Sequence, residues 1–163
     1  MTIGVATVTC SDTRTEADDE GGARLRALLS GAGFNVLAHR IVREDMLSLR
    51  TAVADLLAVP EVDAVVTTGG TGIAPRDRTI EAVGALFDKT LAGFGEAFRR
   101  LSWDQVGARS ILSNATAGVA KDKIVIALPG SPKALDLAVD ALIAPTLAHM
   151  VALARGRTAH PRP

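Results

Sequence analysis

The sequence has few aromatic side chains and no tyrosine: Phe, Trp and Tyr together make up 3% of its 163 residues. Proteins that bind single-stranded nucleic acid usually stack the bases on aromatic side chains, so such a surface is not expected. Lys plus Arg equal Asp plus Glu at 18 each, which gives a formal net charge of zero. The composition therefore offers no basic field for nucleic acid or for an anionic membrane.

Cysteine is also scarce, and the single Cys10 excludes an internal disulfide. Cys10 lies in an apolar run, where we expect a small buried thiol rather than a nucleophile. The histidines, at 39, 149 and 160, are not spaced as metal ligands and have no cysteine partners. The phosphate-loop motif G-x-x-x-x-G-K-S/T and the hydrolase motif G-x-S-x-G are both missing. No G-x-G-x-x-G follows the first apolar run, which disfavours a dinucleotide-binding enzyme.

No N-terminal signal pattern and no apolar stretch of the roughly 18 residues needed to span a bilayer is evident. We therefore expect a soluble, cytoplasmic protein whose partners include neither nucleic acid nor a membrane. The length suits one domain with a sizeable core. We expect that domain at residues 1–155, followed by a flexible C-terminal tail at 156–163.

Apolar β-branched runs alternate with segments of helical spacing. This alternation is typical of a three-layer α/β fold with a mostly parallel central sheet and right-handed crossovers. The predicted strands are 3–10, 34–42 and 61–68, and the predicted helices are 22–31, 47–59, 79–87, 94–103 and 134–154, the last with a bend expected at Pro145. Two extended runs, 108–119 and 123–128, predict a small β-hairpin extension.

The segment Thr-Thr-Gly-Gly-Thr-Gly-Ile-Ala-Pro-Arg-Asp-Arg-Thr at 67–79 joins a predicted strand to a predicted helix. Glycines allow positive φ and a close approach of the backbone to a ligand. Exposed main-chain amides at such a turn favour phosphate. The candidate phosphate-binding residues are Thr68, Gly69, Gly70, Thr71 and Gly72. The alternative is an ordinary tight turn in which Asp77 or Thr79 caps the helix.

Asp77 would repel a bound phosphate unless a cation lies between them. Mg²⁺ binds carboxylate and phosphate oxygens together, so Asp77 is a candidate Mg²⁺ ligand. Arg76 and Arg78 flank it, and either could pair with Asp77, contact phosphate or simply lie on the surface.

Other polar segments follow predicted strands at the edge where open α/β sheets bind ligands. They are Ser11 to Thr13, Glu44 with Asp45, and Pro129 to Lys133, where Lys133 could hold phosphate as a point charge. Glu44 and Asp45, like the acids at 16 and 18–20, could instead serve only as caps or first-turn charges of helices. Together these loops suit magnesium-assisted chemistry on a phosphate.

Several motifs in a fixed order carry a family resemblance. They are T-T-G-G-T-G at 67–72, R-D-x-T at 76–79, G-F-G-E at 93–96, L-S at 112–113 and L-P-G-S-P-K-A at 128–134. This ordered set resembles the molybdenum cofactor biosynthesis family MoaB/MogA, over about residues 3–153. Residues 117–119 and the turn at 129–133 are closer to the MoaB branch.

The resemblance implies a molybdopterin-binding-domain-like fold and an activity. The activity is Mg²⁺-dependent transfer of an adenylyl group from ATP to molybdopterin, which gives adenylylated molybdopterin and pyrophosphate. The product later receives molybdate or tungstate. The resemblance also implies homotrimers, or homohexamers in the MoaB branch, and makes other enzymes of the pathway candidate partners. A non-catalytic MoaB-branch protein that binds molybdopterin or a pathway partner is the alternative.

Site residues carry over by position. Asp77 and Glu44 match catalytic positions, with Asp77 also the metal ligand, and residues 69–72 match the nucleotide phosphate loop. The other ligand-facing positions are Ser11, Asp12, Thr68, Ser113, Pro129, Gly130, Ser131 and Lys133. Two residues depart from the adenylyltransferase pattern: Glu44 replaces an aspartate, and Asn114 stands where arginine commonly follows the serine. The second change removes an expected phosphate partner.

Overall fold

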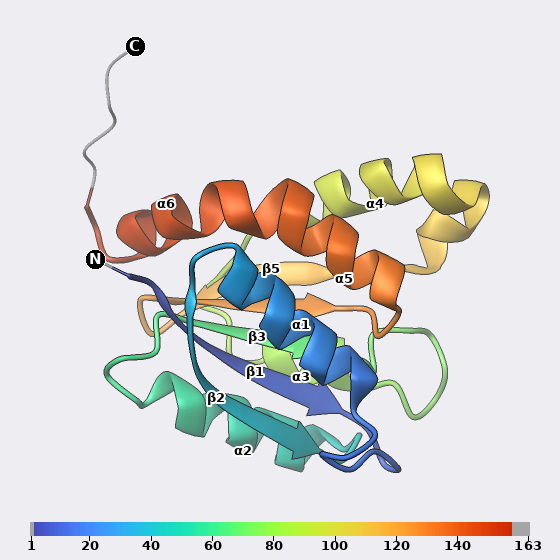
Figure 1. The fold of residues 1–163 in the computed structure, drawn as a ribbon, viewed down its shortest axis with the longest axis horizontal. Helices are drawn as coiled ribbons and strands as arrows, with labels where there is room; N and C mark the ends of the chain where they lie inside the picture. The colour runs from blue at the N-terminus through green and yellow to red at the C-terminus, as the bar shows by residue number, and fades with distance from the viewer. Residues whose placement is uncertain (1, 158–163) are drawn as a thin grey trace.

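The computed structural model describes residues 2–157, which form a mixed sheet covered by helices on both faces (Figure 1). The six strands lie in the order β2-β1-β3-β6-β5-β4. Their bounds are β1 (Gly4–Cys10), β2 (Asn35–Val42), β3 (Ala64–Thr68), β4 (Lys89–Thr90), β5 (Thr116–Ala120) and β6 (Lys123–Leu128). The first four in this order are parallel, whereas β5 and β4 are antiparallel to their neighbours. The predicted fold class, including the β5–β6 hairpin, is confirmed.

The helical segments divide between the two faces. Their bounds are α1 (Glu20–Gly31), α2 (Met46–Leu57), α3 (Thr79–Gly84), α4 (Ala92–Val106), α5 (Pro132–Ala138), α6 (Ala144–Ala154), the 3₁₀ segment η1 (Gly107–Leu112) and the π segment η2 (Val139–Ile143). One core contains apolar residues of α1, α4, α5 and α6, and the other contains residues of α2 and α3 (Figure 1). The sheet thus separates two hydrophobic layers.

The central strands are mostly apolar and carry no charged residue, because both of their faces are covered. Every residue of β1 and β3 is buried. Successive side chains of a strand point to opposite faces, so Val66 and Ile126 enter the first core while Val65 and Val125 enter the second. This arrangement fixes the register of the strands that lead into the candidate site.

Some predicted boundaries are wrong, and one short strand was missed. Residues 107–112 form η1 rather than the start of a strand, because α4 ends at Gly107, whose φ of +59° turns the chain. The strand β5 therefore begins only at Thr116. The helix expected at 79–87 ends at Gly84, and the two-residue β4 was not predicted because it is too short to show an apolar pattern.

The closing helix also differs from expectation. The stretch Pro132–Ala154 has 23 residues and a mean hydropathy of 1.8, so the expectation that no apolar stretch reaches membrane-spanning length is wrong. This helix is long and apolar enough to cross a membrane by length and composition only, and core helices of soluble proteins can be equally long and apolar. Leu135, Ile143 and Leu147 are fully buried in the first core. The closing helix departs from α-helical geometry at the π segment η2. Pro145, where a bend was expected, follows this segment in the first turn of α6.

The predicted tail at 156–163 falls mostly outside the described residues, and His160 lies outside them as well. Of its described part, Gly156 has a φ of +71°, and the Arg157 amide donates a hydrogen bond to the Ala152 carbonyl. These two residues therefore close the C-terminal end of α6. The single domain at 1–155 stays a prediction.

A buried polar network joins β1, β2 and the start of α1. Asp19 is the N-cap of α1, and its Oδ1 accepts a hydrogen bond from the Gly22 amide at 2.9 Å. Its Oδ2 accepts from Thr9 Oγ1 at 2.9 Å and lies 2.8 Å from His39 Nε2. His39 Nδ1 lies 2.8 Å from Thr7 Oγ1. The side chains of His39 and Asp19 are only 6% and 2% exposed. The network attaches the loop after β1 to the sheet.

These contacts favour the ionised form of the Asp19 carboxyl group. Burial acts to raise its pKa, but hydrogen bonds from Gly22, Thr9 and His39 outweigh burial and hold the pKa below its usual range. A carboxyl group whose native pKa is lowered stabilises the fold above its unfolded pKa, and this contribution disappears as pH falls through the native pKa. The reading of Asp19 as a first-turn charge thus missed its place in a buried network.

We predict that Asp19→Asn lowers the free energy of unfolding by about 1–3 kcal/mol at pH 7, because an amide cannot accept all the hydrogen bonds of the carboxylate. The difference from the parent protein should shrink in acid as Asp19 becomes protonated. Urea unfolding at pH 7 and at low pH measures both effects. Asp55→Asn is the matched control, since Asp55 is 59% exposed and pairs with Arg40 at 3.5 Å. Equal effects of the two substitutions would contradict the prediction.

Candidate functional site

A cavity opens where the parallel strands end. It has a volume of about 870 Å³ and lies between the loop after β3, the turn after β6 and the corner of α4 and η1. Ligand pockets for small molecules typically range from about 300 to 1,000 Å³. The structure brings these predicted site residues into its lining: Gly70, Thr71, Gly72, Asp77, Ser113, Pro129, Gly130, Ser131 and Lys133. The remaining five, Ser11, Asp12, Glu44, Thr68 and Gly69, lie outside the lining.

The glycine-rich loop rests against the end of β1 and the start of α3. Gly69 has a φ of +89°, and a Cβ there would lie 2.7 Å from the Cys10 carbonyl oxygen. Gly70 has a φ of +67°, and its Cβ would lie 2.4 Å from Thr79 Oγ1. Glycine is therefore required at both positions for space as well as for conformation. Cys10 is buried beneath this loop, and burial raises the pKa of its thiol to about 12. The expectation of an inert, buried cysteine agrees with this environment.

The amides of this loop are available to a ligand. The N–H groups of Gly70, Thr71 and Gly72 donate no hydrogen bond to any residue that the structure describes. All three residues line the cavity. Buried or partly buried amides are normally paired, so successive free N–H groups at a cavity wall indicate a place for an anion.

Asp77 faces the same cavity and does not cap α3. The N-cap of that helix is Arg78, without a side-chain cap bond, and Thr79 is already the first helical residue. Asp77 Oδ2 accepts a hydrogen bond from the Ala74 amide at 2.9 Å, while Oδ1 has no hydrogen-bond partner among the described residues. The alternative of Asp77 or Thr79 as a helix cap is therefore wrong. One carboxylate oxygen is left for a ligand.

A further acid, Glu44, is close enough to both Asp12 and Asp77 to be affected by their charges. Asp12 Oδ1 accepts a hydrogen bond from the Glu44 amide at 3.0 Å, which joins the loops after β1 and β2. The Glu44 carboxylate is 13% exposed and lies 3.8 Å from Arg76 Nε. Arg76 therefore pairs with Glu44 and not with Asp77.

The Glu44 carboxyl has an altered pKa. Burial raises this pKa, and the Arg76 guanidinium partly offsets that effect. The negative charges of Asp12 and Asp77 add to the rise. A raised carboxyl pKa with identifiable charged neighbours is frequent in functional sites. Glu44 is therefore affected by the charge of Asp77, which lines the cavity, although Glu44 itself is outside the lining.

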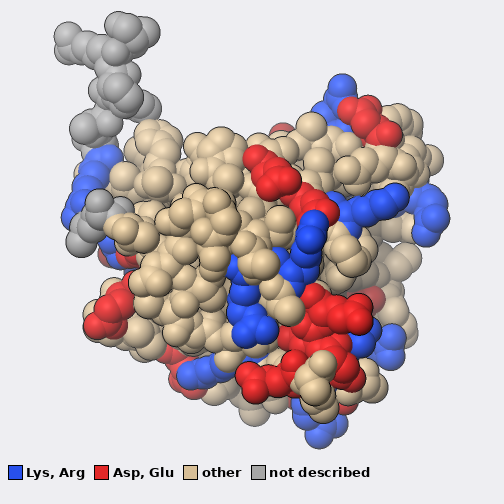
Figure 2. All heavy atoms as spheres, viewed as in Figure 1, with Lys and Arg blue, Asp and Glu red and all other residues tan. Residues whose placement is uncertain are grey.

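Negative charge also surrounds the loop between β1 and α1. Figure 2 shows Asp and Glu side chains gathered over this loop. Asp12, Glu16, Asp18 and Glu20 are all exposed there. A phosphate-bearing ligand on this side of the molecule would need a compensating cation.

The remaining predicted residues shape the loops. Ser11 Oγ accepts hydrogen bonds from the amides of Thr13 and Arg14 at 3.2 and 3.1 Å. Thr68 Oγ1 donates to the Pro129 carbonyl at 3.2 Å and thereby holds the two ligand-facing turns together.

Capping explains two more of these side chains. Asp45 is the N-cap of α2 and Ser131 is the N-cap of α5, each accepting a hydrogen bond from the amide three residues later. Asp45 therefore serves as a helix cap, which was the structural alternative to a site role. Lys133 is exposed at the cavity rim.

The wall formed by α4 and η1 was not predicted. It contributes Phe98, Ser102, Gln105, Arg109 and Ser110 to the cavity lining. Arg109 and Ser110 lie in the run expected to be extended but form part of the 3₁₀ segment η1, which is why their place at the cavity is not evident from the sequence. The signal that could have found them is Gly107, since glycine commonly terminates a helix.

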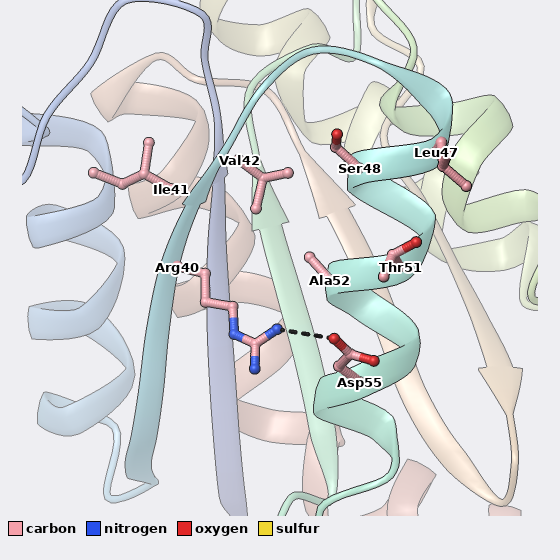
Figure 3. A pocket seen from close by; sticks show the side chains of 8 residues that line it. All are labelled: Arg40, Ile41, Val42, Leu47, Ser48, Thr51, Ala52 and Asp55. Carbon is pink, nitrogen blue, oxygen red and sulfur yellow. Dashed lines mark hydrogen bonds and ion pairs between the residues drawn. The ribbon is translucent and has the colours of Figure 1, made fainter.

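A second cavity lies at the edge of the sheet, between β2 and α2 (Figure 3). Its volume is about 490 Å³, and its lining includes Val42, Leu47 and the ion pair of Arg40 with Asp55. None of the glycine-rich residues line it. The cavity at the strand ends is therefore the candidate functional site.

Comparison with known proteins agrees with the fold. The family model described as "Probable molybdopterin binding domain" matches residues 6–149. The chain belongs to this family. A curated relative from Bacillus cereus, named Molybdenum cofactor biosynthesis protein B, is 46% identical over 144 residues, which cover 88% of this chain and 85% of the relative.

Solved structures of the family resemble the whole fold. A crystal structure of Molybdenum cofactor biosynthesis protein B is 43% identical, with a TM-score of 0.92, and the match covers 96% of this chain and 98% of the other. The tungsten cofactor synthesizing protein MoaB from Pyrococcus furiosus is 36% identical, with a TM-score of 0.86 and coverage of 94% and 98%. The resemblance to the MoaB/MogA family is thus confirmed.

We predict that Gly70→Ala destabilises the fold by about 1–3 kcal/mol, since alanine at this positive φ is strained and its Cβ would contact Thr79. Gly93→Ala is the control, because a Cβ at Gly93 meets no atom within 4 Å and its φ is not positive. Chemical denaturation of both variants tests this prediction. Similar stabilities for the two variants would show that the loop does not need glycine at position 70.

Proposed function

We propose that this protein is a Mg²⁺-dependent molybdopterin adenylyltransferase. The observation that supports it is the row of free amides at Gly70, Thr71 and Gly72 in the wall of an 870 Å³ cavity beside Asp77. The family and the names of the relatives support the broader role in molybdenum or tungsten cofactor biosynthesis. We propose the cytoplasm as its location and other enzymes of this pathway as candidate partners.

In the proposed reaction, a phosphate oxygen of molybdopterin attacks the α-phosphorus of ATP. A new phosphorus–oxygen bond forms while the bond to the bridging oxygen of the β-phosphate breaks, and the electron pair leaves with pyrophosphate. The amides of residues 70–72 would hold the triphosphate by hydrogen bonds. The opposite wall, with Arg109 and Ser113, would hold the acceptor. Catalysis of this kind depends on positioning and charge stabilisation.

The residues of the site fit Mg²⁺. Among the described residues no group of three or more His, Cys, Asp or Glu side chains could hold a metal alone. Mg²⁺ usually binds one or two carboxylates together with substrate phosphates and water, which matches the free Oδ1 of Asp77 with Glu44 nearby. When bound, Mg²⁺ would neutralise the charge of the phosphates.

Incubation of the protein with MgATP and molybdopterin, followed by separation of the products, tests the proposed activity. We expect adenylylated molybdopterin and pyrophosphate in equal amounts. Asp77→Asn should reduce turnover at least about 100-fold, because the amide loses the negative charge that binds the cation. Asp104→Asn removes an exposed carboxylate on α4 and should leave turnover unchanged. No adenylylated product from folded protein would reject the activity.

A second candidate function is binding of molybdopterin or a pathway partner without catalysis. Glu44 and Asn114 favour it, because each departs from the adenylyltransferase pattern and each is already engaged within the protein. Calorimetry separates the two functions. Clear Mg²⁺-dependent binding of ATP would argue against this second function, whereas binding of molybdopterin without binding of ATP would support it.

We also propose that a second copy of the chain covers the outer face of the closing helix. Only 28% of the most apolar part of this helix is buried. Ala141, Ala144, Pro145 and Ala148 are exposed, and no Asp, Glu, Lys or Arg occurs from 141 to 154. Such a face suits association of copies into the homotrimer or homohexamer expected from the resemblance.

We predict that Ala148→Glu reduces the mass measured by light scattering to that of a smaller assembly, because the added charge would be buried between copies. Ala58→Glu makes the same change at an exposed site after α2, on the other side of the sheet, and should not alter the mass. An unchanged mass for Ala148→Glu, or a monomeric parent protein, would reject this interface.

A further inference from the structure

Two residues, Thr79 and Asn114, donate hydrogen bonds to the carbonyl groups of the glycine-rich loop. Thr79 binds the first pair: its Oγ1 donates to the Gly69 carbonyl at 2.9 Å, and its amide donates to the Gly70 carbonyl at 3.0 Å. These bonds come from the first residue of α3, so the first half of the loop is held by the element that follows it.

Asn114 binds the second pair. Its Nδ2 donates to the Thr71 carbonyl at 3.1 Å and to the Gly72 carbonyl at 3.4 Å. Asn114 lies between η1 and β5, more than forty residues away from the loop in the sequence. Its neighbour Ser113 lines the cavity. The loop is therefore held by the segment between η1 and β5 as well as by α3, and Asn114 itself does not line the cavity.

The orientation of a carbonyl determines the orientation of the next amide. In a trans peptide unit the C=O of one residue and the N–H of the following residue lie in one plane and point in opposite directions. The described residues contain no cis peptide bond. Binding of the Thr71 and Gly72 carbonyls to Asn114 thus turns the amides of Gly72 and Ile73 away from Asn114. Thr79 has the same effect on the amides of Gly70 and Thr71.

We propose that Asn114 is a positioning residue: by binding the Thr71 carbonyl it orients the amide of Gly72 for phosphate binding, and by binding the Gly72 carbonyl it fixes the next peptide unit. This inference rests on the proposed function, in which the loop binds the triphosphate. Asparagine suits the task because its uncharged amide group carries two N–H donors, one for each carbonyl. Aspartate has the same shape but only accepts hydrogen bonds when ionised, so it would repel both carbonyls.

Calorimetric titration of Asn114→Asp with inorganic tripolyphosphate, and separately with ATP, both with Mg²⁺, tests this role. The parent protein should bind both probes. In the variant both affinities should fall about tenfold or more, which corresponds to the loss of one or two hydrogen bonds. Asn35→Asp makes the same chemical change at the exposed start of β2, at the opposite end of the strands, and should leave both affinities unchanged.

Two further variants separate the lost donors from the added charge. Asn114→Ala removes the donors without adding charge, and we expect the same direction of change with a smaller loss of affinity. Asn114→Gln retains the donors on a longer side chain and should bind more tightly than the other two variants. These variants also keep the test valid if Asn114→Asp does not fold.

A spectroscopic measurement distinguishes positioning from general stability. In ¹⁵N-labelled protein without ligand, Asn114→Ala should shift the amide resonances of Gly72 and Ile73. The resonances of Gly70 and Thr71, whose peptide units are held by Thr79, should change little, and so should the melting temperature.

Each outcome has a distinct meaning. If the parent protein binds neither tripolyphosphate nor ATP, the proposed phosphate site itself is wrong. If the parent binds both and the Asn114 variants bind equally well, Asn114 is not a positioning residue while the proposed function stands. If affinity falls only together with a collapse of the melting temperature and of all loop resonances, the role of Asn114 is structural and the inference is overturned.

Discussion

The glycine-rich loop can present its amides to a ligand because its carbonyl groups accept hydrogen bonds from Thr79 and Asn114. The loop starts from β3, in the middle of the sheet, where Thr68 is aligned with Thr9 on one side and Leu128 on the other. The Gly69 amide continues this ladder by donating to the Leu128 carbonyl at 3.0 Å. The sheet therefore fixes where the loop begins, and Thr79 and Asn114 fix how its peptide units are turned.

Electrostatics sets the second requirement of the site. Free amides attract an anion, yet Asp77 places negative charge in the same cavity. The charges of Asp77 and Asp12 also add to the raised pKa of Glu44. A divalent cation between phosphate and carboxylate reconciles the two. The loop that carries Asp12 is held by the buried pair of Asp19 and His39. Packing deep in the fold thereby supports the charge arrangement at the strand ends.

The parts of the structure that local sequence determines could be predicted. The strands β1 and β3 are runs of β-branched and small residues without a charge, and the glycine-rich loop is recognisable because only glycine fits positions 69 and 70. Features that depend on distant partners could not. The hydrogen bonds of Asn114 join segments that no sequence pattern relates, and η1 carries Ile111 and Leu112, which resemble strand residues locally. Arg109 reaches the cavity only because α4 packs beside the turn after β6.

The buried thiol of Cys10 lies under Gly69 and Gly70, and its pKa of about 12 leaves almost no thiolate at neutral pH. An alkylating reagent can reach this sulfur only after the loop has lifted from the end of β1. The rate of Cys10 alkylation therefore reports how often the loop opens, and no engineered probe is needed. A ligand that stabilises the closed loop would lower this rate, so ligand binding could be followed by mass spectrometry of the labelled protein.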